Sequence, residues 1–158
     1  GTITESYSTG DITGDSCTGG IAGCVGGTVT RSYSTGDVTS SDSAGGIAGY
    51  VQSGGTISSC AAANEKIAYS GSGTVYLGRV VGRNDSSIAN DNFANSDMKL
   101  NGVIVSDGTD ENGIGKPLSE LQTQTTYEDG LDWQFGSSDA APWKMSVNTG
   151  YPIFYWQE

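Results

Sequence analysis

The hexapeptide SYSTGD occurs at Ser6–Asp11 and again at Ser32–Asp37, 26 positions later. The likeness extends further, because the nine residues that begin at Ser6 and at Ser32 agree at seven positions. A unit that recurs every 20 to 50 residues is typical of solenoids, propellers and arrays, since a single unit cannot bury its own apolar face. The repeat therefore predicts a stacked architecture, and we interpret SYSTGD as one rung of that stack.

A glycine-centred block follows each copy, and it is the second half of the repeat. GGIAGCV at Gly19–Val25 matches GGIAGYV at Gly45–Val51 at six of seven positions. The third copy is looser, with Thr56–Cys60 continuing the pattern and Gly78–Gly82 (GRVVG) in the glycine-rich slot. Ile88 begins a fourth copy. The sequence thus predicts about three coils.

Each period contains three short stretches of strand character, at Thr28–Tyr33, Gly36–Thr39 and Gly45–Val51. Apolar residues do not recur at helical spacing, and a propeller blade needs roughly 40 residues or more. Three strands in 26 residues suit one coil of a parallel β-helix, with coils about 4.8 Å apart. We predict an all-β fold, a parallel β-helix (β-solenoid).

Equivalent positions in successive coils should form inward-facing ladders of aliphatic side chains. The predicted ladders are Ile3, Val29, Ile57 and Ile88; Ile21, Ile47 and Val80; and Ile12 with Val38. Alternation along the glycine-rich strand predicts one face with Ile47, Gly49 and Val51 and the opposite face with Ala48 and Tyr50.

The composition of the chain changes after the repeats, so we predict repeats in residues 1–97 and a capping segment in 98–158, packed on the last coil. PLSELQTQTTY at Pro117–Tyr127 predicts one short helix, ended by Asp129-Gly130. An aromatic cluster follows that holds all three tryptophans, Trp133, Trp143 and Trp156. Covering strand edges against aggregation would explain the cluster, and stacking on a sugar is the alternative.

The net charge limits the classes of binding partner, and the cysteine spacing limits metal and redox chemistry. Seven basic and eighteen acidic residues give a net charge of −11, which disfavours nucleic acid and anionic membranes as partners. No apolar run approaches the roughly 20 residues that cross a bilayer, so we expect no membrane insertion by this segment. The three cysteines, Cys17, Cys24 and Cys60, lack CxxC spacing. We interpret them as small residues that fill positions in the coils, and the alternative is that two of them form one disulfide.

Two groups of side chains are candidate sites. The acidic loop after Val105 offers oxygen ligands for calcium from Asp107, Asp110 and Asn112, although it lacks the residue order of an EF-hand. Stacked carboxylates at Asp11 and Asp37 would also attract a divalent cation. We interpret the loop as a solvated turn and expect no cofactor, with calcium as the one alternative.

The candidate ligand-binding residues are Trp133, Trp143 and Trp156, because sugars stack on exposed rings. The sequence contains no histidine, so it offers no Ser-His or Cys-His nucleophile and no His-ligated metal. We therefore expect no catalytic residues.

The repeats and the C-terminal segment together resemble a family. The GGIAG blocks, each preceded by SYSTGD, resemble the GLUG motif of bacterial cell-surface proteins. The end of the chain resembles the "LGWDF, W, YP" segment that often closes GLUG regions, at Leu118–Gln124, Leu131–Phe135, Trp143–Met145 and Gly150–Ile153. Departures are Arg79 in a glycine slot, Cys60-Ala61 in place of Ser-Tyr, and Gln134 in place of an acidic residue.

The resemblance implies a secreted or wall-attached bacterial protein, in which such regions serve as stalks or adhesive modules and sometimes flank an IgA-cleaving peptidase. We expect a non-catalytic structural or adhesive module of a longer parent chain, extracellular or at the cell surface, with a glycan or protein ligand. The alternatives are a carbohydrate-binding module that uses the C-terminal aromatics and a fragment of a polysaccharide-degrading β-helix enzyme.

Overall fold

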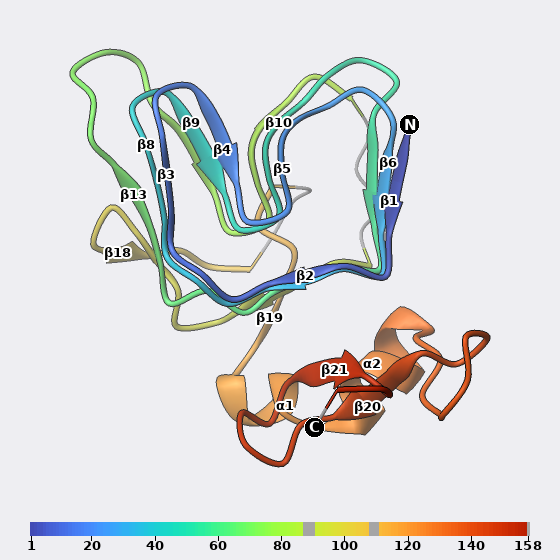
Figure 1. Ribbon diagram of the computed structural model, residues 1–158. Coiled ribbons are helices and arrows are strands. Elements are labelled where there is room, and N and C mark those ends of the chain that lie inside the picture. The colour runs from blue at the N-terminus through green and yellow to red at the C-terminus, as the bar shows by residue number, and fades with distance from the viewer. Residues whose placement is uncertain (87–90, 108–110, 158) are drawn as a thin grey trace.

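Strands at the same position in successive coils pair side by side and build a parallel β-helix (Figure 1). The computed structural model describes residues 1–86, 91–107 and 111–157. Three coils are complete and a partial fourth follows, which confirms the predicted fold class. The repeat sets the register, because Ile3 pairs with Val29 and Val29 with Ile57.

Five sheets run along the axis of the helix. The first contains β1 (Thr2–Thr4), β6 (Thr28–Thr30) and β11 (Thr56–Ser58). The second, named the basal sheet here, contains β2 (Tyr7–Ser8), β7 (Tyr33–Ser34), β12 (Ala61–Ala62), β16 (Phe93–Asn95) and β19 (Ile114–Lys116).

The third sheet is parallel except at its last strand. It contains β3 (Ile12–Gly14), β8 (Val38–Ser40), β13 (Lys66–Tyr69), β17 (Lys99–Leu100) and the antiparallel β18 (Val103–Ile104). The fourth contains β4 (Cys17–Gly19), β9 (Ser43–Gly45) and β14 (Tyr76–Gly78). The fifth contains β5 (Ala22–Val25), β10 (Ala48–Val51) and β15 (Val81–Asn84).

The prediction of three strands per coil is wrong, because each complete coil has five. The predicted strand Gly45–Val51 is two strands, with a turn at Gly46-Ile47 between β9 and β10. The turn forms a fold that dips into the cross-section of the helix (Figure 1), named the inward arch here. Glycine is needed because the two sides touch: a Cβ on Gly49 would overlap the backbone nitrogen of Thr18.

The arch also corrects the predicted faces of the glycine-rich strand. Ile47 in the turn and Ala48 at the start of β10 are both fully buried, since the turn lies inside the molecule. Their neighbours come from both sides of the arch and from the outer sheets. An alternation rule for one continuous strand does not apply across a turn.

The three aliphatic ladders are confirmed within the described residues. Ile12 pairs with Val38, and Ile67 extends that ladder. Backbone hydrogen bonds place Ile21 beside Ile47 and Ile47 beside Val80. Ile88, the predicted fourth member of the first ladder, lies outside the described residues.

The C-terminal segment holds two helices and a hairpin rather than the single predicted helix. They are α1 (Leu118–Leu121), α2 (Gln124–Leu131), β20 (Trp143–Met145) and β21 (Pro152–Phe154). Residues 122 and 123 separate the helices. Gly130 does not end α2, which runs to Leu131 and closes at Asp132 in the left-handed region (φ 54°). Instead, Gly130 lets the helix approach the ring of Phe93, which a Cβ would meet at 2.5 Å.

The C-terminal segment lies along the side of the β-helix, against the outer face of the basal sheet (Figure 1). It contacts Tyr7 of the first coil, Tyr33 of the second, Ala61 of the third and Phe93 of the fourth. The sequence analysis predicted packing on the last coil, but the segment contacts four of the five strands of the basal sheet, from β2 to β16. The division at residues 97 and 98 stays a prediction, although β17 to β19 continue the strand stack beyond it.

Candidate functional site

Two of the three candidate calcium ligands contact an arginine side chain or its backbone. Arg79 has a fully buried side chain, and its Nη2 lies 2.9 Å from Asp107 Oδ1. Its Nε donates to the carbonyl oxygen of Asn112 at 2.9 Å, and the Asn112 side-chain oxygen accepts from the Arg79 backbone N–H. Asp110 lies outside the described residues. A guanidinium this close to the carboxylate repels a second cation.

Described residues provide no other acidic cluster of metal-binding size. Among them, no group of three or more Cys, Asp or Glu side chains is placed to hold a metal ion. Asp11 and Asp37 do lie on successive rungs, and Asp11 Oδ1 accepts the backbone N–H of Asp37 at 2.9 Å. The third rung carries Lys66 instead, 3.7 Å from Asp37 Oδ2. The predicted carboxylate ladder therefore ends after two members.

The corner beside Lys66 is hollowed into a groove of about 370 Å³. Charges of both signs line it, together with one amide and one aliphatic side chain: Asp37, Glu65, Lys66, Asn95, Asp97, Lys99 and Leu118. Such a mixture can hydrogen-bond a polar ligand, and it includes no concentration of one charge that would select an ion.

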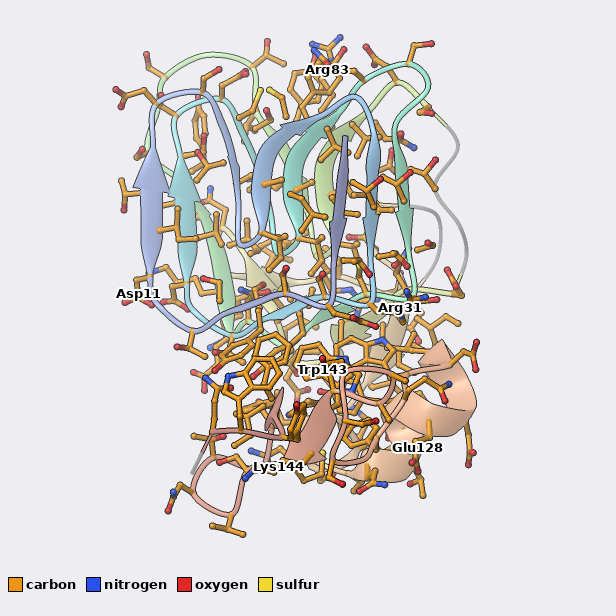
Figure 2. All side chains as sticks on the ribbon, turned by 45° about the vertical axis from the view of Figure 1, so that its right-hand side comes forward. Asp11, Arg31, Arg83, Glu128, Trp143 and Lys144 are labelled. Atoms are coloured by element: carbon orange, nitrogen blue, oxygen red, sulfur yellow. The ribbon has the colours of Figure 1, made fainter. Side chains whose placement is uncertain are left out.

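Two of the three predicted ligand-binding tryptophans belong to the interior. Trp133 and Trp143 are 1% and 0% exposed, and their rings stack on each other with centroids 4.7 Å apart. Figure 2 shows Trp143 at the boundary between the C-terminal segment and the β-helix. A sugar cannot reach either indole, so the predicted stacking role does not extend to them.

Trp156 is the tryptophan that faces solvent, with 61% of its surface exposed. One face of its ring stacks on Phe154, with centroids 4.6 Å apart and planes 7° from parallel. Tyr155 meets it edge-on, and the Tyr155 hydroxyl is held by Asp139 at 2.9 Å. That hydrogen bond raises the pKa of Tyr155. These residues, Phe154, Tyr155 and Trp156, form the aromatic platform.

A second cluster stands at the open mouth of the inward arch, where Figure 2 labels Arg83. The Arg83 guanidinium lies over the rings of Tyr50 (4.7 Å) and Tyr76 (5.3 Å) and pairs with Asp85 at 3.1 Å. The Tyr50 hydroxyl donates to Asp85 at 2.5 Å, which raises the pKa of Tyr50 and lowers that of Asp85. Cys17 and Cys24 occupy the same mouth in the first coil. The sequence analysis did not predict that these residues lie close together, because it did not predict the arch.

Comparison with known proteins gives one structural match. No family model matches the chain, and neither does any curated protein. The crystal structure of a "putative immunoglobulin A1 protease" from Bacteroides ovatus is similar to this chain, with a TM-score of 0.65 and 21% sequence identity. The match covers 100% of this chain and 58% of that one. At this identity the likeness concerns the fold, and the GLUG resemblance stays a prediction.

No helix in the described part of the chain is long and apolar enough to span a membrane.

Proposed function

We propose that this chain is a non-catalytic structural module, with an adhesive role, in a longer bacterial protein that is secreted or held at the cell surface. The observation that carries the proposal is that one C-terminal segment contacts four successive levels of the strand stack. The GLUG resemblance and the likeness to part of the Bacteroides ovatus structure support the same reading.

The contacts of the segment are spread along the axis. Tyr7 of the first coil bonds Gln157 (3.0 Å), and Tyr33 of the second bonds the carbonyl oxygen of Pro152 (2.7 Å). The indole of Trp133 bonds the third coil, and Gly130 packs against Phe93 of the fourth. A β-helix has only nearest-neighbour contacts between coils, so such a segment makes separation of any two coils costlier. A rigid spacer or display scaffold needs that property.

The side chains whose pKa values the fold shifts most are buried residues that pack in the interior. Burial raises the pKa of Tyr33 and of Tyr127, and both hydroxyls donate to backbone carbonyl oxygens of the C-terminal segment. Acids and bases of an enzyme instead line a cleft, with pKa values matched to their task. This pattern favours the structural reading over the polysaccharide-degrading alternative.

A carbohydrate-binding role is the second candidate, and the aromatic platform favours it. Trp156 is 61% exposed and its ring is supported on one face by Phe154, which suits stacking against a pyranose. This candidate would supply the adhesive part of the proposal.

The first experiment follows unfolding of the whole chain in urea with two probes, tryptophan fluorescence and far-ultraviolet circular dichroism. The second assays the whole chain for cleavage of immunoglobulin A1 and of a panel of polysaccharides. Trp133 and Trp143 report on the C-terminal segment, and circular dichroism reports on the strands. If the chain is one structural unit, the two probes should give the same unfolding curve, and neither immunoglobulin A1 nor any polysaccharide should be cleaved. Cleavage that Asp97→Asn or Glu65→Gln in the groove abolishes would contradict the proposal. On a glycan array, Trp156→Ala should remove any binding and Trp133→Phe should keep it.

A further inference from the structure

Two rows of side chains face each other across the mouth of the inward arch. The fourth sheet contributes Cys17, Ser43 and Tyr76 at one position of successive coils. The fifth sheet contributes Cys24, Tyr50 and Arg83 at another. In the third coil the two rows are in contact, because the Arg83 guanidinium lies 5.3 Å from the centroid of the Tyr76 ring. The first coil therefore places Cys17 opposite Cys24.

The backbone geometry of the first coil agrees with this pairing. Cys17 and Cys24 are equally far from the turn at Gly20-Ile21, so they are opposite each other when the chain reverses there. A Cβ on Gly23 would lie 2.8 Å from the Cys17 carbonyl oxygen, which shows how closely the two strands approach. Disulfides join residues whose Cα atoms are about 4.4–6.8 Å apart, a separation that strands in contact provide.

We propose that Cys17 and Cys24 form a disulfide bond that links β4 and β5 across the inward arch of the first coil. The two thiols already interact. A hydrogen bond with Cys17, more than burial, raises the pKa of the Cys24 thiol to about 11. Cys24 is exposed and Cys17 half-buried, so an oxidant can reach the pair.

The chemistry is thiol–disulfide exchange with a small disulfide such as oxidised glutathione. One cysteine, as its thiolate, attacks a sulfur of the small disulfide and expels one small thiolate, which takes up a proton. The second cysteine, as its thiolate, attacks the protein sulfur of the mixed disulfide and expels the other. The protein loses two S–H bonds and gains one S–S bond, and the small disulfide is reduced to two thiols.

Cys60 is the built-in control. Its side chain is fully buried, and the thiol donates to the carbonyl oxygens of Ser58 (3.2 Å) and Val29 (3.8 Å). Full burial keeps a small disulfide from reaching the Cys60 sulfur, whereas Cys24 is exposed, and burial also raises the pKa of Cys60 to about 12. We expect Cys60 to stay reduced in the folded protein.

The test equilibrates the whole folded chain with oxidised and reduced glutathione at about pH 8.5, quenches with acid, and alkylates the remaining thiols after denaturation. The expected result is one alkylated cysteine, Cys60, and a peptide map that joins Cys17 to Cys24. Cys60→Ser, which copies Ser32 of the second coil, should keep the link and leave no alkylated thiol. The double variant Cys17→Ser with Cys24→Tyr copies Ser43 and Tyr50 of the second coil, and should fold without a link.

Three results would overturn the proposal. They are alkylation of all three cysteines at every glutathione ratio, a link that includes Cys60, and glutathione adducts on Cys24 in place of the internal bond. None of them would affect the proposed structural role, which rests on the C-terminal segment.

Discussion

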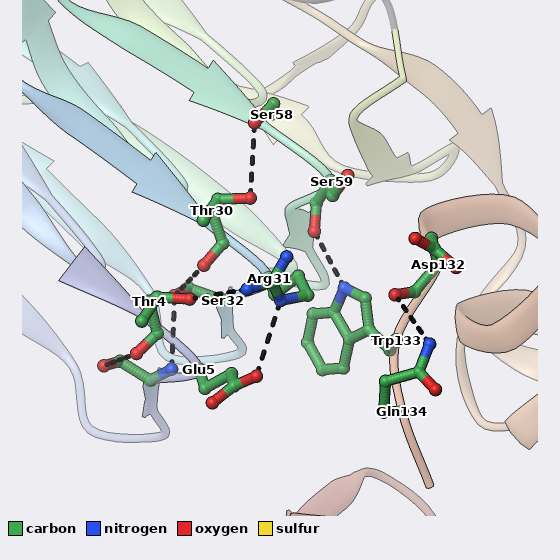
Figure 3. Close-up of polar contacts among 11 residues, drawn as sticks. Thr4, Glu5, Thr30, Arg31, Ser32, Ser58, Ser59, Asp132, Trp133 and Gln134 are labelled. Atoms are coloured by element: carbon green, nitrogen blue, oxygen red, sulfur yellow. Dashed lines mark hydrogen bonds and ion pairs between the residues drawn. The ribbon is translucent and has the colours of Figure 1, made fainter. Parts of the chain in front are cut away.

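The indole N–H of Trp133 donates a hydrogen bond to the backbone carbonyl oxygen of Ser59, which is 2.8 Å away and 74 positions earlier in the chain (Figure 3). Ser59 stands at a corner in the left-handed region (φ 52°), as Arg31 and Glu5 do one and two coils earlier (φ 46° and 48°). The contact ties the end of α2 to a corner that every coil repeats. It is one of several by which the aromatic segment holds the β-helix from the side.

Loss of the Trp133 side chain should be costly. Trp133→Ala removes a 1% exposed indole together with its hydrogen bond, and we expect the free energy of unfolding to fall by about 3–5 kcal/mol. Trp156→Ala, at a 61% exposed position, should lower it by less than about 1 kcal/mol. Urea denaturation measures both, and equal losses would show that Trp133 does not hold the segment to the helix.

The SYSTGD repeat contains its own matched pair of glycines. A Cβ on Gly36 would overlap the carbonyl oxygen of Gly10 on the preceding rung, whereas a Cβ on Gly10 meets no atom within 4 Å. Gly36→Ala should therefore destabilise by about 2 kcal/mol or more. Gly10→Ala should leave stability unchanged or raise it by up to about 1 kcal/mol, because alanine restricts the unfolded chain. Thermal unfolding that ranks the two variants the other way would refute the stacking of these rungs.

Stability should fall at alkaline pH. Burial raises the pKa of Tyr33 and Tyr127 above the ordinary tyrosine value, and that of Cys60 to about 12. Above about pH 9 for the thiol and pH 10 for the phenols, the unfolded chain loses these protons first, so the free energy of unfolding decreases as pH rises. Below about pH 9 these groups have no effect. Urea titrations from pH 8 to 11 check this, and Cys60→Ala should remove the earliest part of the decrease. A flat profile would be inconsistent with buried hydroxyls.

The register of the coils could be predicted from the sequence, because side chains such as Val29 and Ile57 repeat with the rungs they occupy. The inward arch could not, since a run of glycine and alanine gives no alternation by which a turn is recognised. Ala48 was assigned to the wrong face for that reason. The aromatic cluster was recognised, but composition does not distinguish a buried Trp143 from an exposed Trp156. The repeated aromatic residues Tyr7 and Tyr33 on the outer face of the basal sheet were the sequence signal that another segment of the chain covers this sheet.

Calcium should have no effect on stability. Asp107 and Asn112 are engaged by Arg79, and in the described chain no cluster of acidic side chains is placed to hold an ion. The midpoint of thermal unfolding should be the same in millimolar calcium and in chelator at matched ionic strength. A rise of several degrees with calcium, lost in Asp107→Asn, would restore the loop as a metal site.

Amide hydrogen exchange in the whole chain tests the central claim, that the C-terminal segment supports all coils from the side. Trp143 contacts Tyr7 of the first coil and Tyr33 of the second, each with ring centroids 6.3 Å apart. Trp143→Ala, or Trp143→Phe if the former does not fold, should accelerate exchange in β2 and β7 as well as in β16, relative to Trp156→Ala. Acceleration confined to residues 93–116 would instead indicate a cap on the last coil and contradict this account.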